Sequence, residues 1–166
     1  MRIFKLSFSI FIFSIALSIG AVALETSAQS AILINADTFS VIYSKNAEQR
    51  LPMASTTKIM TGLLLAEQNS DDRIITTTKE MVYVEGSSMG LKVGDTVSFR
   101  DLLYGIMLPS GNDAANTAAI AISGSVDKFS QKMNLKAHEL GLHNTNFVTP
   151  SGLDADGHFT TAYDLS

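Results

Sequence analysis

The apolar positions of the chain follow two spacings, and the change of spacing separates the predicted strands from the predicted helices. Residues 31–34 and 41–43 are rich in strand-forming side chains on either side of a polar turn, which predicts a short antiparallel hairpin. Apolar residues then recur at helical intervals through residues 55–68. This pattern predicts a helix whose first turn contains Ser55.

The middle of the chain changes character twice. Residues 74–84 are rich in Thr, Val and Ile and are expected to be extended, and residues 86–94 form a loop punctuated by glycines. Ser98 followed three residues later by Asp101 is the pattern of a capping box, which marks the start of a helix. A second helix is therefore predicted from Ser98 until Pro109 stops it.

The last part of the chain predicts two more helices and a long loop region. Residues 113–123 are rich in alanine, which indicates a helix in close contact with its neighbours, and Gly124 ends it. An apolar stripe through residues 126–140 predicts another helix, with Gly141 in a left-handed cap. A strand pair followed by several helices indicates an α+β fold, and the length suits one globular domain.

The N-terminus has the order of segments found in secretory signal peptides. Two basic residues precede an apolar run at 6–19 and a region of small residues. We predict a signal peptide over 1–28, with cleavage after Ala28 or Ala23, and an exported mature part at 29–166 that acts outside the cytoplasmic membrane. A retained membrane anchor is the alternative, although the run is shorter than the roughly 20 residues that a span needs.

Composition excludes several functions. A net charge of −4 and a pI near 5.2 provide no basic surface for nucleic acid. Cysteine is absent, so disulfides are excluded. The three histidines have no spacing typical of a metal site, so we expect surface or capping roles for them, no metal and no cofactor. They are His138, His143 and His158.

Chemistry is suggested by the tetrapeptide Ser-Thr-Thr-Lys at 55–58. In a helix, Lys58 lies on the same face as Ser55, and a neutral lysine amine can remove the proton that makes a serine hydroxyl a poor nucleophile. Such a pair also occurs by chance. A second one, Ser125 to Lys128, is interpreted as a helix cap with a solvated lysine.

The triplet Ser110-Gly111-Asn112 lies in a turn between two predicted helices, where a rigid backbone can present a hydroxyl and an amide. With this triplet, the chain resembles the serine D-alanyl-D-alanine carboxypeptidases, which are low-molecular-weight penicillin-binding proteins. The resembling segments are residues 51–61, 86–91, 102–115 and 161–165. The resemblance implies a β-lactamase/transpeptidase-like DD-peptidase fold with a helical subdomain and an antiparallel sheet.

The resemblance also implies a role for each matching residue. Ser55 would form the acyl-enzyme, with its backbone N–H as an oxyanion donor, and Lys58 would accept its proton. Ser110 would relay a proton to the leaving D-alanine, while Asn112 would bind the substrate amide and help to orient Lys58. The substrate would be a peptidoglycan stem peptide ending in D-Ala-D-Ala, and β-lactams would be covalent inhibitors.

The chain departs from the family pattern in one important way. The family's Lys-Thr-Gly element on an edge strand has no counterpart in these 166 residues. We therefore expect 29–166 to be a partial catalytic domain whose C-terminal strands, together with the family's membrane-binding C-terminal helix, are missing. A serine β-lactamase, with Glu85 as a candidate for deacylation, and an inactive wall-binding module remain alternatives.

Overall fold

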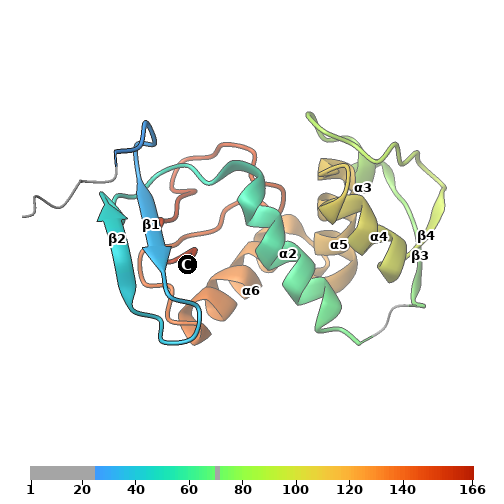
Figure 1. The fold of residues 1–166 in the computed structure, drawn as a ribbon. Coiled ribbons are helices and arrows are strands. Elements are labelled where there is room, and N and C mark those ends of the chain that lie inside the picture. Colours follow the sequence, from blue (N-terminus) through green and yellow to red (C-terminus); the bar gives the residue numbers. More distant parts are fainter. Residues whose placement is uncertain (1–24, 70–71) are drawn as a thin grey trace, which may run out of the picture.

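The structure is a computed structural model that describes residues 25–69 and 72–166. The predicted signal peptide at 1–28 therefore falls almost wholly outside the described residues. Figure 1 shows a strand pair at each end of the molecule and helices between them. The C-terminal loops return to the side of the first strand pair. The predicted α+β class is confirmed by this arrangement.

The first strand pair is the predicted hairpin. Strands β1 (Ala31–Ile34) and β2 (Val41–Lys45) pair in antiparallel fashion, with an irregularity in register between Leu33 and Ile34. The turn is built by Asn35, whose side-chain oxygen accepts the backbone N–H groups of residues 37 and 38, each at 2.9 Å. An asparagine side chain can replace a backbone acceptor in this way, and this explains why the polar segment turns.

The helices follow the apolar pattern closely. A short 3-10 turn, η1 (Ala54–Thr56), leads into α2 (Thr57–Ala66), and the later helices are α4 (Phe99–Met107), α5 (Asn112–Ser123) and α6 (Val126–Glu139). The predicted capping box of Ser98 and Asp101 opens α4. Gly124 and Gly141 have φ angles of 82° and 78°, as expected for left-handed residues that end helices.

The prediction of extended structure over 74–84 is wrong for most of the segment. Only β3 (Ile74–Thr76) is a strand, paired with β4 (Thr96–Ser98), and it is followed by the short helix α3 (Lys79–Val82). Asn116 on α5 donates to two carbonyl groups of α3, those of Glu80 at 2.8 Å and Met81 at 3.1 Å. This contact with α5 stabilises a turn of helix that local strand propensity does not predict.

Helix α2 lies between two hydrophobic clusters. One cluster joins it to α6 and the other joins it to α4 and α5; their largest fully buried side chains are Leu64, Leu102, Ile106, Phe129 and Met133. Four alanines of α5 are completely buried, which lets its backbone approach neighbouring helices closely; they are Ala114, Ala115, Ala118 and Ala119. The start of α2 is thus held by packing on both sides. None of the helices in 25–69 and 72–166 is long and apolar enough to cross a membrane.

Candidate active site

Ser55 lies at the exposed start of the central helix, in the 3-10 turn that precedes α2. The preceding residue, Ala54, has a φ angle of 45°, a left-handed conformation that costs an alanine energy and places the serine at a sharp bend. Lys58 follows one helical turn later, and its Nζ lies 3.1 Å from the Ser55 Oγ. The expected approach of these two side chains along the helix is present.

Lys58 is buried, with 3% of its surface exposed. Its Nζ donates to the backbone carbonyl of Ser151 at 2.7 Å, and no carboxylate within the described ranges forms an ion pair with it. Burial penalises the ammonium form, and the pKa of Lys58 is therefore below the ordinary lysine value. A lysine in this environment gives up its proton more readily than a solvated lysine does.

Ser110 brings a second hydroxyl to the same point from a distant part of the chain. Its Oγ lies 3.1 Å from the Ser55 Oγ. Its own φ angle is 58°, and the turn is fixed by the Gly111 N–H, which donates to the Gly105 carbonyl at 2.8 Å. A Cβ on Gly111 would lie 2.9 Å from that carbonyl oxygen, so the tight return of the chain requires glycine here.

Asn112 opens α5, and its side chain faces the preceding loop. Its Nδ2 donates to the Glu85 carbonyl at 2.7 Å, and its backbone N–H donates to the Ser87 carbonyl at 2.7 Å. The Lys58 amine meets Ser55 and Ser151 instead of Asn112. The side chain of Glu85 is exposed, so the contribution of this residue at Asn112 is its backbone carbonyl.

Sequence reasoning missed the function of Asp113. Its buried carboxylate accepts hydrogen bonds from the Ser88 hydroxyl at 2.6 Å and from the N–H groups of Met89, Gly90 and Leu91 at 2.9 to 3.0 Å. Burial raises the pKa of Asp113, but these hydrogen bonds outweigh burial and hold the pKa below the ordinary aspartate value. The carboxylate thus joins the glycine-rich loop to the turn that carries Ser110.

The sequence predicts a turn at 149–152, but sequence reasoning missed that this turn supplies the acceptor for Lys58. The Thr61 hydroxyl on α2 donates to the Pro150 carbonyl at 2.6 Å and fixes this turn against the helix. Gly152 has a φ angle of 86° and sits so close to Ala54 that an added Cβ would collide with the Ala54 carbonyl. The nucleophile turn and the loop of the lysine acceptor are therefore in direct backbone contact.

This contact leads to a stability prediction for Gly152→Ala. The collision together with the left-handed φ angle should lower the free energy of unfolding by about 2–4 kcal/mol. Gly157→Ala is a matched control, because Gly157 has a φ angle of 82° but an added Cβ would meet only Asn146, at 3.7 Å. Urea denaturation of both variants should show the larger loss for Gly152, and equal losses would contradict the backbone contact.

The three histidines have different environments. His138 and His143 are exposed, with ring centroids 6.3 Å apart, as the surface prediction expected. For His158 a surface role is wrong, because it is 5% exposed and bonds to both Thr57 and the backbone of Val148. Packing of the C-terminal loop against α2 buries it, which the sequence pattern does not reveal. No group of three or more metal-binding side chains occurs in the part of the chain that the structure describes.

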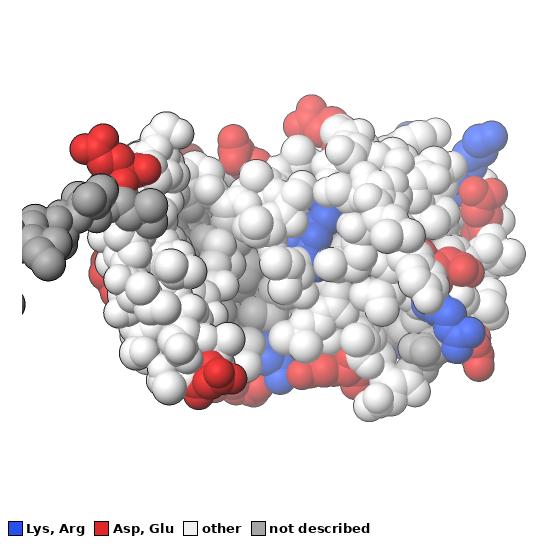
Figure 2. Space-filling view, in the orientation of Figure 1, with Lys and Arg blue, Asp and Glu red and all other residues white. Residues whose placement is uncertain are grey.

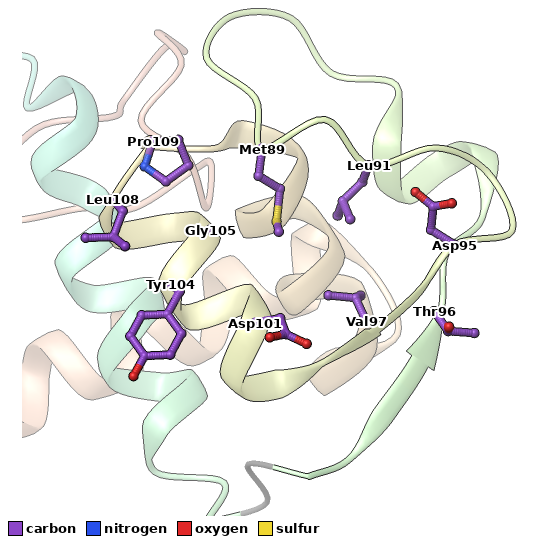
Figure 3. A pocket seen from close by; sticks show the side chains of 10 residues that line it. All are labelled: Met89, Leu91, Asp95, Thr96, Val97, Asp101, Tyr104, Gly105, Leu108 and Pro109. Carbon is purple, nitrogen blue, oxygen red and sulfur yellow. The ribbon is translucent and has the colours of Figure 1, made fainter.

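A cavity of about 620 Å³ lies behind the turn of Ser110, and Figure 3 shows its lining. Leu108 and Pro109 line it and directly precede Ser110, while the serine itself faces Ser55. The two carboxylates that line this cavity form hydrogen bonds with residues close to them in sequence. Asp95 accepts the Lys92 N–H, and Asp101 belongs to the capping box. The chemical groups that meet at Ser55 do not line this cavity.

Charged side chains are dispersed over the face of the molecule drawn in Figure 2. Figure 2 shows acidic and basic side chains scattered mainly around the edges of the face drawn in Figure 1, and they do not gather in one patch. Among the described residues, ion pairs lie at the surface, such as those of Lys136 with Glu67 and Glu139.

An α+β fold with a serine at the head of its central helix, a buried lysine one turn later and a second serine from a helix–helix turn is the architecture of the DD-peptidases. The chain belongs to the peptidase S11 family of D-alanyl-D-alanine carboxypeptidases, whose family model matches residues 18–166. The resemblance found in the sequence and the DD-peptidase fold that it implied are both confirmed.

Similar proteins support the same assignment. The chain is 44% identical over 144 residues to the D-alanyl-D-alanine carboxypeptidase DacF of Bacillus subtilis, covering 84% of this chain and 37% of that protein. It is 37% identical over 153 residues to DacD of Escherichia coli, covering 86% and 39%. The crystal structure of DacD from Francisella tularensis superimposes with a TM-score of 0.81 at 34% identity, covering 86% and 36%. The chain thus spans well under half the length of these relatives.

Proposed function

We propose that the protein is a serine D-Ala-D-Ala carboxypeptidase that removes the terminal D-alanine from peptidoglycan stem peptides through an acyl-enzyme on Ser55. The observation that carries the proposal is the meeting of three groups: the Ser55 hydroxyl lies 3.1 Å from both the Lys58 amine and the Ser110 hydroxyl. Family membership supports the choice of substrate. The names of the curated relatives agree with it.

The proposed acylation begins with Lys58 in its neutral form. The amine takes the proton of Ser55 as the Oγ attacks the carbonyl carbon of the penultimate D-alanine, and a tetrahedral intermediate forms. This proton then passes through the Ser110 hydroxyl to the nitrogen of the terminal D-alanine, and the C–N bond breaks. The products are an ester on Ser55, free D-alanine and a neutral lysine.

Hydrolysis reverses the proton path. A water molecule gives a proton to Lys58 while its oxygen attacks the ester carbonyl, and the proton returns to the Ser55 Oγ as the ester C–O bond breaks. The shortened stem peptide leaves with a new carboxyl group. The lowered pKa of Lys58 supports both steps, because a base works best when its pKa lies near the working pH.

Two further groups fit the proposed substrate. The Ser55 N–H has no acceptor among the described residues and stands at a helix start, where it suits a developing oxyanion. The Asn112 side chain is held by the Glu85 carbonyl through its Nδ2. Its Oδ1 is then oriented as an acceptor for a substrate amide N–H. The family's Lys-Thr-Gly element, which is not in these 166 residues, would complete substrate binding.

We also propose that the protein is exported and acts at the cell-wall face of the membrane. The basic, apolar and small-residue segments at 1–28 support export, and peptidoglycan lies outside the cytoplasmic membrane. β-Lactam antibiotics are the proposed covalent inhibitors. One of the similar solved structures is penicillin binding protein 6B of Escherichia coli, at 36% identity and a TM-score of 0.80.

The test is covalent labelling of the native polypeptide by a fluorescent penicillin, with the adduct located by mass spectrometry. We expect an adduct on Ser55 and none in Ser55→Ala. Ser125→Ala is the matched control, because Ser125 and Lys128 repeat the same spacing but serve as a helix cap, and it should label normally. Undiminished labelling of Ser55→Ala by a folded protein would overturn the assignment of the nucleophile.

The lifetime of the adduct separates the related activities. A carboxypeptidase should keep the penicilloyl ester for minutes or longer and should release D-alanine from a D-Ala-D-Ala peptide. A β-lactamase should instead release hydrolysed penicillin rapidly, because it has a base for deacylation. The exposed side chain of Glu85 offers no such buried base, which favours the carboxypeptidase.

A further inference from the structure

His158 is a buried histidine that connects two parts of the candidate site. Its Nε2 lies 2.8 Å from the Thr57 Oγ1, in the first turn of α2 and one residue before Lys58. Its Nδ1 accepts the backbone N–H of Val148 at 2.9 Å. The imidazole thereby connects the helix that carries Lys58 to the loop segment that leads to Ser151.

The hydrogen bonds determine the form of the ring. Because Nδ1 accepts an N–H group, the proton of the neutral imidazole lies on Nε2, which donates to the Thr57 hydroxyl. A second proton on Nδ1 would point at the Val148 N–H, and two donors would then face each other. The site therefore requires a neutral histidine.

We propose that His158 is a positioning residue for Lys58. Its neutral imidazole fixes the 148–151 segment to the first turn of α2, so that the Ser151 carbonyl holds the lysine amine beside Ser55. This inference rests on the proposed function, in which Lys58 is the base. It adds a residue that touches none of the reacting groups and acts through Thr57 and the loop.

The distances favour this route. The Lys58 Nζ reaches the Ser151 carbonyl at 2.7 Å, and this carbonyl lies three residues after the Val148 N–H that His158 accepts. A second hydrogen bond, from the Thr61 hydroxyl to the Pro150 carbonyl, fixes the middle of the turn but does not hold the residues that lead into it. Loss of the imidazole should therefore free the entry to the turn and let the Ser151 carbonyl move away from the amine.

Charged groups around the ring agree with a neutral form. Asp154, in the same loop, favours the imidazolium and raises the pKa of His158. On α2, the charged residue next to Thr57 is Lys58. Burial dominates, and the pKa of His158 is lowered from its ordinary value. The imidazole therefore stays neutral at pH 7, and protonation at acid pH should release Val148 and, with it, the Ser151 carbonyl.

The test compares three substitutions of His158 in the native polypeptide. His158→Leu fills similar space without hydrogen bonds, while His158→Asn keeps an acceptor near Nδ1 and His158→Gln keeps a donor near Nε2. We expect the second-order rate constant for penicillin acylation at pH 7 to fall about 10–100-fold in the Leu variant, since small displacements of a catalytic group have effects of this size. The Asn and Gln variants should each recover part of the rate. His143→Leu, at an exposed histidine, should leave it unchanged.

Two readouts separate positioning from general stability. In NMR titrations of labelled lysine, the Lys58 pKa should rise towards its ordinary value in His158→Leu, because a loosened loop admits water to the amine. In acylation pH profiles, the rate of the wild type should fall at acid pH through two ionisations, the protonation of Lys58 and the protonation of His158. In His158→Gln, only the ionisation of Lys58 should remain.

The outcomes are distinct from those that test the proposed function. If the wild type forms no adduct, the proposed function fails, yet the Lys58 titration still reports on positioning. A folded Leu variant with a wild-type acylation rate and an unchanged Lys58 pKa would overturn the role of His158. If the Leu variant does not fold, the same measurements on His158→Gln decide, and a wild-type rate with an unchanged acid limb would overturn the proposal.

Discussion

Replacing Lys58 with methionine is expected to lower the rate of Ser55 acylation by at least about 10³-fold, because removal of a base that activates a nucleophile has effects of this order. Methionine has a similar length and fills the buried space beside α2. The Ser55 and Ser110 hydroxyls should remain in contact, but nothing would take the proton of Ser55. Stopped-flow measurement with a fluorescent penicillin gives the rate.

The same substitution should not unfold the protein. Lys58 is buried with a carbonyl and a hydroxyl as partners, so methionine removes an expensive buried charge and leaves only the Ser151 carbonyl unsatisfied. Because the folded pKa of Lys58 is lowered, the wild type gains stability as pH rises from that pKa towards the unfolded value near 10.4. The stability advantage of the methionine variant should therefore be largest below the folded pKa and should shrink at alkaline pH.

Lys128→Met is the control for this experiment. Lys128 occupies the corresponding place in the second Ser-x-x-Lys pattern, is exposed, and should be replaceable without change in acylation. Acylation by the wild type should rise with pH through a pKa below the ordinary lysine value. A Lys58→Met protein that acylates at a rate close to that of the wild type would mean that another group removes the proton of Ser55.

Local patterns in the sequence predicted the parts of the fold that local interactions determine. The hairpin, the helices and the caps at Ser98, Gly124 and Gly141 depend on neighbours within a few residues, and all are present. The prediction of extended structure over 74–84 was wrong because a distant residue, Asn116, donates hydrogen bonds to the carbonyl groups of α3. Tertiary contact overrides a strand propensity that amounts to only about 1 kcal/mol.

In the candidate site, too, the sequence predicts what local spacing determines and does not predict contacts between distant residues. The approach of Lys58 to Ser55 follows from helical spacing, but Ser110 lies 55 residues away from Ser55, and only family resemblance placed it there. The Ser151 carbonyl gave no signal, because any residue type supplies a backbone carbonyl. The burial of His158 likewise depends on a contact with Thr57, 101 residues earlier in the chain. Patterns within one segment do not report such contacts.

Asp113→Ala is expected to cause the largest loss of stability, about 3–5 kcal/mol, because it removes a buried carboxylate that accepts four hydrogen bonds from residues 88–91. The Ser88 hydroxyl and the N–H groups of residues 89–91 all converge on this carboxylate. Asp113→Asn should lose nearly as much, since its amide NH₂ would face donors. Guanidinium denaturation measures both, and Asp127→Ala, at an exposed position in the first turn of α6, should lose less than about 1 kcal/mol.

The pH dependence tests the cause of this loss. Because the folded pKa of Asp113 is lowered, its contribution is complete above the unfolded aspartate value near 3.9 and disappears as pH falls through the folded pKa. The stability difference between wild type and Asp113→Asn should therefore be constant near neutrality and narrow below about pH 4. A difference that persists unchanged at lower pH would mean that shape, and not the carboxylate charge, organises the loop. Because this loop holds Asn112 through the Glu85 and Ser87 carbonyls, the acylation rate should fall together with the stability.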